Sequence, residues 1–150
     1  MLPDVAKVRS ILGGFEIRAE STTLGVVVHV AAADAPEVLG ALKDSDLDFA
    51  MLVDLLGDDT GDAVGITYHL RSFSRDEDLY IKTVVAYDGV LCSVWNAYAS
   101  ALLPERETAE LFGLTLSGHP NPKRLLTTEG EEPLLRTSVP VRTLEEVRDR

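Results

Sequence analysis

Cysteine is almost absent from this sequence, which has one, Cys92, in 150 residues. One thiol excludes an intrachain disulfide, a four-cysteine zinc site and an iron–sulfur cluster held by this chain alone. The three histidines, His29, His69 and His119, lie far apart, whereas zinc sites usually draw on closely spaced pairs. We therefore expect no metal ligands and no cofactor-binding residues in this chain.

Long apolar runs are also missing. Residues 24–33 form the longest candidate, but His29 interrupts them and Asp34 follows. A bilayer span needs roughly 18 to 20 apolar residues. The first residues lack the basic head and apolar middle of a signal peptide. These absences predict a soluble, cytoplasmic protein.

Basic residues are few, with 14 Lys and Arg against 25 Asp and Glu, a net charge of -11. Neutralising nucleic-acid phosphates needs clustered cations, so the sequence excludes nucleic acid as a partner. The same charge argues against direct attraction to anionic lipid. One interpretation of the acidic composition is that it keeps the protein soluble, and the alternative is that it binds a partner with a basic face.

Catalytic motifs are missing too. The stretch at residues 57–61, GDDTG, has no lysine for phosphate and lacks the spacing and final glutamate of a calcium loop, so it predicts a loop or turn. The G-x-S-x-G motif of a nucleophile elbow is absent. We expect no catalytic residues and no self-contained active site.

Periodicity predicts the secondary structure of the first half of the chain. The predicted elements are a helix at 4–12 ended by Gly13 and Gly14, a strand at 15–20, a turn at 21–23, a strand at 24–30, and a helix that Asp34 caps and that runs to about residue 43. Glu37 is expected to reach back to the Asp34 amide. Residues 49–55 could be strand or helix, and we favour a strand.

The second half alternates in the same way. Residues 64–71, 79–87 and 90–94 predict three strands of a meander, residues 95–100 are ambiguous, and Pro104 begins a helix that Gly113 ends. From Leu125 onward the periodicity is lost. The chain is therefore expected to be a single α+β domain, with a mainly antiparallel sheet, flanking helices and an extended C-terminal tail.

The helix after Pro104 carries one misplaced charge. At 100° per residue from Pro104, Glu105 falls at about 100°, between Phe112 and Ala109 on the apolar side. A carboxylate there needs the positive end of the helix dipole, hydrogen bonds or a cation from elsewhere. Arg106 and Glu110 have the spacing of an exposed ion pair. The alternative is that Glu105, Arg106 and Glu107 are all surface residues serving solubility and the dipole.

These residues resemble the signature of the C subunit of respiratory complex I, the 30 kDa subunit family of NADH-quinone oxidoreductase. The matching positions are Glu105, Arg106, Glu107, Glu110, Leu111, Phe112, Gly113, Gly118, His119, Pro120, Lys123, Arg124 and Leu125. Weaker likeness at 49–59, 68–70 and 132–136 extends the resemblance over about residues 47–137. Ala109, Glu132 and Thr137 depart from the family's usual residues. The resemblance divides the chain into a domain of the 30 kDa subunit type, 1–126, and a tail, 127–150.

The resemblance implies a non-catalytic structural subunit in the peripheral arm of a proton-translocating NADH-quinone oxidoreductase. It implies partners in the quinone-site large subunit and the terminal-cluster subunit, and a place on the cytoplasmic face of the inner membrane, reached only through the complex. FMN, iron–sulfur clusters, NADH and quinone would belong to the complex and not to this chain. The alternatives are the corresponding subunit of a membrane-bound hydrogenase-like complex and a stand-alone acidic binding module.

The resemblance also gives a set of expected partner-interface residues. This interface set consists of Glu105, Arg106, Glu107, Glu110, His119, Pro120, Lys123, Arg124 and Arg136. Residues 127–143 are expected to lie extended along a partner and to become fully ordered only there.

Overall fold

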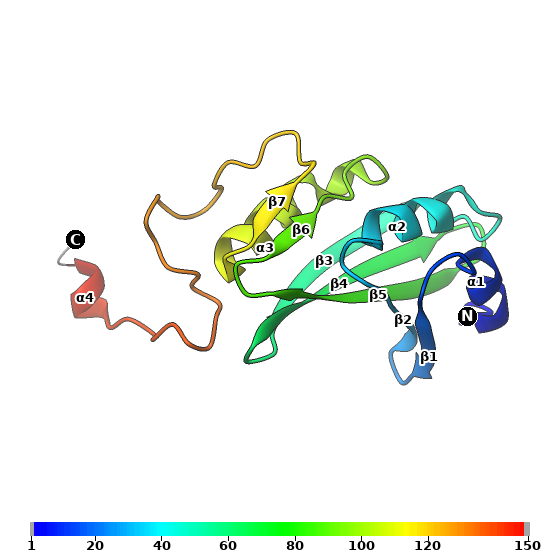
Figure 1. Ribbon diagram of the computed structural model, residues 1–150, viewed down its shortest axis with the longest axis horizontal. Coiled ribbons are helices and arrows are strands. Elements are labelled where there is room, and N and C mark those ends of the chain that lie inside the picture. Colours follow the sequence, from blue (N-terminus) through cyan, green and yellow to red (C-terminus); the bar gives the residue numbers. More distant parts are fainter. Residues whose placement is uncertain (1, 149–150) are drawn as a thin grey trace.

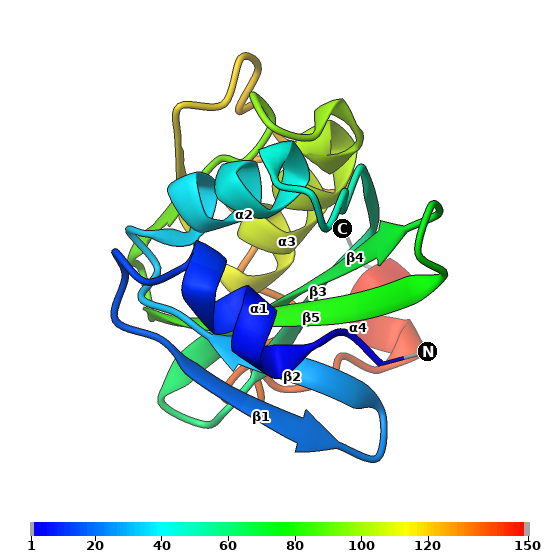
Figure 2. The same cartoon turned by 90° about the vertical axis from the view of Figure 1, so that its right-hand side faces the viewer.

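The computed structural model describes residues 2–148 and has an α+β fold. A five-stranded sheet, in the order β1-β2-β5-β4-β3, carries α1 and α2 on one side, and α3 packs beside β3 (Figures 1 and 2). The elements are α1 (Val5–Ile11), β1 (Arg18–Thr22), β2 (Gly25–His29), α2 (Ala35–Asp44), β3 (Met51–Asp59), β4 (Ala63–Ser72), β5 (Glu77–Ala86), β6 (Val90–Cys92), the 3-10 helix η1 (Ala99–Ala101), α3 (Leu102–Phe112), β7 (Thr115–Ser117) and α4 (Leu144–Arg148). The predicted fold class, mainly antiparallel, is confirmed.

The N-terminal elements follow the prediction with three corrections. The first strand begins at Arg18 and not at residue 15. Ser21 and Thr22 belong to β1, so the turn predicted at 21–23 lies later, where the Thr22 hydroxyl donates to the carbonyl of Gly25. Asp34 gives no side-chain cap to α2, and its amide donates to Ala31 instead of meeting Glu37. The chain already turns before Asp34, so the capping arrangement expected from sequence is not needed.

The ambiguous segment before residue 60 is a strand, as favoured from sequence. It continues through Gly57 and Asp59, which pair with Ile66 and Val64 of β4. The loop predicted at 57–61 is therefore wrong for its first three residues, because a full antiparallel ladder outweighs the weak strand propensity of Gly and Asp. The turn itself is short and uses the Asp59 side chain, which accepts from the Gly61 amide.

The predicted meander is wrong for its last strand. After Gly89, β6 leaves the main sheet and pairs in parallel with β7, a strand that was not predicted. The amide of Thr115 donates to Gly89, which brings the segment after α3 back to this point. A three-residue strand carries too little alternation to be recognised. This second sheet places the loop after residue 117 next to the start of α3.

The core lies between the sheet and the helices. Among the largest fully buried side chains are Tyr68, Phe49, Leu39, Leu42 and Ile66. The Tyr68 hydroxyl is buried with no hydrogen-bond partner among the described residues. Such a group keeps the full desolvation cost of a hydroxyl.

We expect Tyr68→Phe to raise the free energy of unfolding by about 1 kcal/mol, because it removes a buried hydroxyl that makes no bond. Tyr98→Phe is the matched control, since the Tyr98 hydroxyl donates to the Phe49 carbonyl at 2.7 Å, and should lower it by about as much. Urea unfolding measures both. A Tyr68→Phe variant as destabilised as Tyr98→Phe would contradict the assignment.

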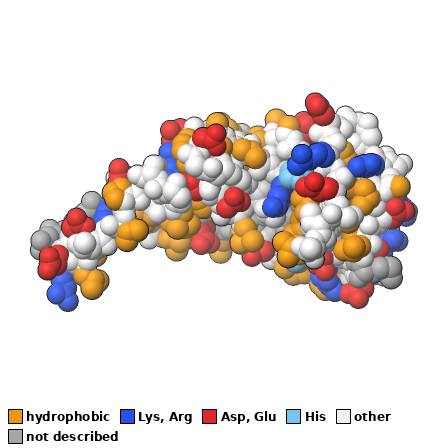
Figure 3. Space-filling view, turned by 90° about the horizontal axis from the view of Figure 1, so that it is seen from below, with side chains coloured by type: hydrophobic (Ala, Val, Ile, Leu, Met, Phe, Trp, Pro, Cys, Tyr) orange, Lys and Arg blue, Asp and Glu red, His pale blue; other side chains and the backbone are white. Residues whose placement is uncertain are grey.

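The tail leaves the domain at the end beyond β3 and has no helix or strand between β7 and α4. Figure 3 shows this arm projecting from the body, with apolar and charged side chains interspersed. The extended form predicted through residue 150 is wrong for 144–148, which form α4. There Thr143 and Glu146 each accept from the other's amide, an arrangement that starts a helix locally. Residues 149–150 lie outside the described residues.

Candidate functional site

The interface set gathers around α3. Glu105, Arg106, Glu107 and Glu110 lie on the helix, His119 to Arg124 lie in the loop that follows β7, and Arg136 lies in the tail at the other end of the helix. The contacts divide the set into a buried end, a middle clamp and a C-terminal cap.

Glu105 forms the buried end. It lies in the first turn of α3 with 0% of its surface exposed. Its carboxylate accepts from the Ser93 hydroxyl at 2.5 Å and from the Val94 amide at 2.7 Å. The hydrogen bonds come from the chain that leads into η1, and they tie the start of α3 to the end of β6.

His119 completes this end, and two hydrogen bonds hold its ring. Its Nε2 donates to the Leu102 carbonyl at 2.8 Å, and its Nδ1 accepts from the Asn121 amide at 3.0 Å. These two bonds fix the orientation of the ring. Nε2 lies 3.8 Å from the Glu105 carboxylate, beyond hydrogen-bond distance.

Of the stabilising contacts that the sequence predicted for the Glu105 carboxylate, the hydrogen bonds are present and an ion pair with Lys or Arg is not found among the described residues. Burial raises the pKa of Glu105, and the hydrogen bonds from the Ser93 hydroxyl and the Val94 amide oppose this rise. No Lys or Arg pairs with this carboxylate among the described residues. Hydrogen bonds, and not a cation, stabilise the buried carboxylate. As a partner contact Glu105 has no exposed surface to offer in this structure.

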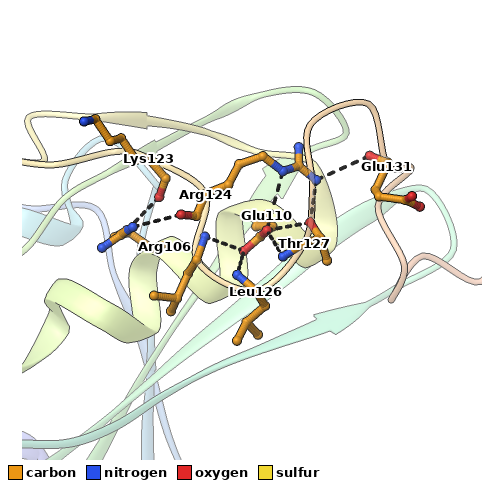
Figure 4. Close-up of polar contacts among 8 residues, drawn as sticks. Arg106, Glu110, Lys123, Arg124, Leu126, Thr127 and Glu131 are labelled. Atoms are coloured by element: carbon orange, nitrogen blue, oxygen red, sulfur yellow. Dashed lines mark hydrogen bonds and ion pairs between the residues drawn. The ribbon is translucent and has the colours of Figure 1, made fainter.

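Arg106 forms one half of the middle clamp. Its Nε donates to the Lys123 carbonyl at 2.6 Å and its second amino nitrogen to the Arg124 carbonyl at 2.9 Å (Figure 4). The expected ion pair with Glu110 is not formed in the part of the chain that the structure describes. The guanidinium binds the loop backbone instead, because its fork matches two successive carbonyls.

Glu110 forms the other half. Its carboxylate accepts from the amides of residues 125–127 at 3.0, 2.9 and 2.6 Å and from the Thr127 hydroxyl at 2.5 Å. Burial alone raises the pKa of Glu110, but the Thr127 hydroxyl and the three amides outweigh it and lower the pKa to about 2. Figure 4 shows both clamp residues reaching from α3 to the same stretch of loop. The loop is thus fixed to the helix over residues 123–127.

Arg136 caps the C-terminal end of α3. Its guanidinium donates to the Phe112 carbonyl at 2.7 Å and the Gly113 carbonyl at 3.2 Å, pairs with Asp88, and lies 4.3 Å from the Tyr87 ring centre. Gly113 ends the helix with φ of 73°, as predicted. A cation at this end stabilises the carbonyls that the helix leaves unpaired. The tail is therefore anchored to the domain at residue 136.

We expect Arg136→Ala to release the tail and to lower the free energy of unfolding by about 1 kcal/mol, because the cap and the contact with Tyr87 are lost. Hydrogen exchange should become faster at the Leu135 amide, which donates to the Leu111 carbonyl. Arg148→Ala in α4 is the control. Unchanged protection at Leu135 would contradict an anchoring role.

The outward-facing members of the set are Glu107, Pro120, Lys123 and Arg124, all exposed. Arg124 contacts the Thr127 hydroxyl at 2.6 Å and lies 3.5 Å from Glu110. Whether these residues touch a partner stays a prediction, as does the boundary at residue 126. Within residues 2–148 no cluster of three or more His, Cys, Asp or Glu side chains could hold a metal ion.

Two residues that organise the site were not expected. Ser93 lies in the predicted last strand and gave no signal, because its bond to Glu105 exists only in the folded chain. Asp59 holds the tail through the Thr137 amide at 2.5 Å and the Thr137 hydroxyl at 2.7 Å, and it accepts from Tyr87. Its only signal was its position in the weaker family segment at 49–59. No helix among residues 2–148 combines the length and apolar character needed to cross a membrane.

The fold resembles a solved structure of an archaeal respiratory membrane complex, the membrane-bound sulfane sulfur reductase. The TM-score is 0.65 at 20% sequence identity, over 76% of this chain and 70% of the other. At this identity the likeness concerns the fold alone.

Sequence comparison with curated proteins is more specific. The chain is 31% identical to an NADH-quinone oxidoreductase C/D subunit of Edwardsiella ictaluri over 95% of its length, which is 26% of that protein. It is also 31% identical to an NADH-quinone oxidoreductase C subunit of Phenylobacterium zucineum over 79% of its length, which is 56% of that protein. The chain thus spans between about a quarter and about half of the length of these relatives.

A family model described as respiratory-chain NADH dehydrogenase, 30 Kd subunit, matches residues 28–145. The match contains all of α3, the loop after β7 and the anchored part of the tail. The chain therefore belongs to the family of the 30 kDa subunit of respiratory-chain NADH dehydrogenase.

Proposed function

We propose that this chain is a non-catalytic structural subunit in the peripheral arm of a proton-translocating NADH-quinone oxidoreductase. One observation carries the proposal: Arg106, Glu110 and Arg136 bind the chain's own backbone and hold residues 123–137 against α3. Groups bound in this way are not available to a substrate. The three side chains fix the loop and the tail in one conformation on α3. A fixed surface of this kind is suited to binding another subunit.

The proposed partners are the quinone-site large subunit and the terminal-cluster subunit. The relatives named as C/D subunits support direct contact with one further subunit of the complex, because a single protein there bears the names of two subunits. On this proposal the chain holds no cofactor, while FMN, iron–sulfur clusters, NADH and quinone belong to the other subunits. It lies on the cytoplasmic face of the inner membrane and reaches the membrane only through the complex.

A second candidate is the corresponding subunit of a membrane-bound hydrogenase-like or reductase complex. The observation that favours it is the fold likeness to the membrane-bound sulfane sulfur reductase, with a TM-score of 0.65. A stand-alone acidic binding module is the third, and the net charge of -11 is all that favours it.

Native purification through a tag on this chain separates the three. We expect a detergent extract of the membranes to give a large complex that oxidises NADH and reduces quinone, with this chain in stoichiometric amount. A complex with a nickel-containing large subunit and no NADH-oxidising subunit would favour the second candidate. A lone, fully folded monomer would favour the third and overturn the proposal.

A further inference from the structure

A groove of about 330 Å³ lies between α3, β7 and the segment that begins at Pro122. Its lining is partly apolar, with Ala109, Leu114 and Leu116 from the domain and Pro122 and Pro133 from the loop and tail. Three cations, Arg106, Lys123 and Arg124, complete it. The clamp formed by Arg106 and Glu110 therefore creates a groove lined by residues of both the domain and the tail.

The acids that line this groove are already engaged. The Glu110 carboxylate is held by the amides of residues 125–127, and Glu131 pairs with Arg142 at 2.9 Å. The basic lining is unusual in a chain with a net charge of -11. The groove lining therefore holds three cations and two acids, on a chain whose net charge is -11.

Two of the cations, Arg106 and Lys123, form no ion pair with an acid among the described residues. Arg106 binds only carbonyl oxygens, because Glu110 at the ion-pair spacing binds the loop instead. The exposed Lys123 ammonium has no carboxylate within 4.0 Å among residues 2–148. Figure 4 shows the Lys123 side chain pointing away from Arg106 and Glu110, and this side chain is exposed.

We propose that this groove is the docking site for a carboxylate-bearing, partly apolar segment of a neighbouring protein subunit. The carboxylate pairs with the Lys123 ammonium at the rim of the groove, while an apolar side chain packs on Leu114 and Leu116. A protein segment fits better than a phosphate or a lipid headgroup. Free phosphate would make no favourable contact with the apolar lining of the groove. The net charge of -11 repels an anionic membrane surface. The inference rests on the proposed function and adds the chemistry of the contact.

Zero-length carbodiimide cross-linking of the purified native complex tests the contact. The reagent joins an amine to a carboxylate only within ion-pair distance. We expect mass spectrometry to find the Lys123 amine joined to an Asp or Glu of another subunit. A complex that contains this chain but yields no Lys123 cross-link to another subunit would overturn the inference and leave the proposed function intact. If the chain enters no complex, the proposed function fails first and the inference with it.

A competition experiment gives the size of the effect. Wild-type and variant chains are expressed together, and their ratio in the purified complex is compared with their ratio in the lysate. Lys123→Glu should be under-represented by about tenfold and Lys123→Gln by about threefold, because the first adds like-charge repulsion to the lost pair. Lys82→Glu, on exposed Lys82 of β5, is the matched control and should be incorporated like wild type. Equal incorporation of Lys123→Glu and wild type, or an equal loss for Lys82→Glu, would overturn the inference.

Discussion

Glu105→Ala is expected to lower the free energy of unfolding by about 3 kcal/mol, the largest effect of any single substitution around α3. The carboxylate is fully buried and accepts from Ser93 and Val94. Alanine would leave a cavity and two buried donors without an acceptor. Loss of these bonds would also free the start of α3 from the end of β6.

The controls separate burial from charge. Glu105→Gln keeps one acceptor oxygen and should cost about 1 kcal/mol. Glu107→Ala, two residues along the same helix but exposed, should change stability by less than about 0.5 kcal/mol. Urea unfolding monitored by circular dichroism measures all three. If Glu105→Ala were as stable as Glu107→Ala, the carboxylate would not organise the helix start.

Glu110→Gln should cost about 2 kcal/mol at pH 7 and progressively less in acid. The folded pKa of about 2 lies below the ordinary value of 4.5, so the ionised carboxylate stabilises the folded chain above pH 4.5. That stability is lost as the pH falls from 4.5 through the folded pKa of about 2. Glutamine also turns an amino group toward amides that need an acceptor.

The difference in unfolding free energy between wild type and Glu110→Gln isolates the contribution of Glu110. Glu105 is present in both proteins, and its pKa is raised, so its contribution changes with pH in the opposite direction. A raised pKa favours the folded chain below the ordinary value and loses that contribution as the pH rises. Unfolding in urea at pH 7, 5 and 3 gives the difference, and hydrogen exchange at residues 125–127 reports the loop directly. Glu107→Gln is the control. A difference that stayed constant across these pH values would contradict the bonding of Glu110.

Local patterns predicted the elements well. Alternation indicated β4 and β5 within about two residues at each end, and Gly113 ended α3 as expected. The helical wheel placed Glu105 on the packed side, and it is buried. These features depend on the period of the chain and on backbone rules that act within a few residues.

The missed features depend on contacts between distant residues. Ser93 meets Glu105 only after β6 and α3 pack together, and β6 pairs with β7 across the whole of α3. The local ion pair of Arg106 and Glu110 was predicted and does not form, because loop amides and carbonyls offer each of them more bonds. An exposed pair at this spacing is worth only a few tenths of a kcal/mol, so several hydrogen bonds easily outweigh it.

On the proposed function, these charged residues serve assembly and not chemistry. Arg106→Ala in cells that lack the wild-type chain tests it most directly, because Arg106 shapes the loop by binding its backbone carbonyls. Two quantities are measured: the amount of assembled complex in the membrane and the NADH-quinone turnover per assembled complex. We predict that the amount falls several-fold while the turnover per complex stays at the wild-type value. Normal assembly with lost turnover would contradict the claim.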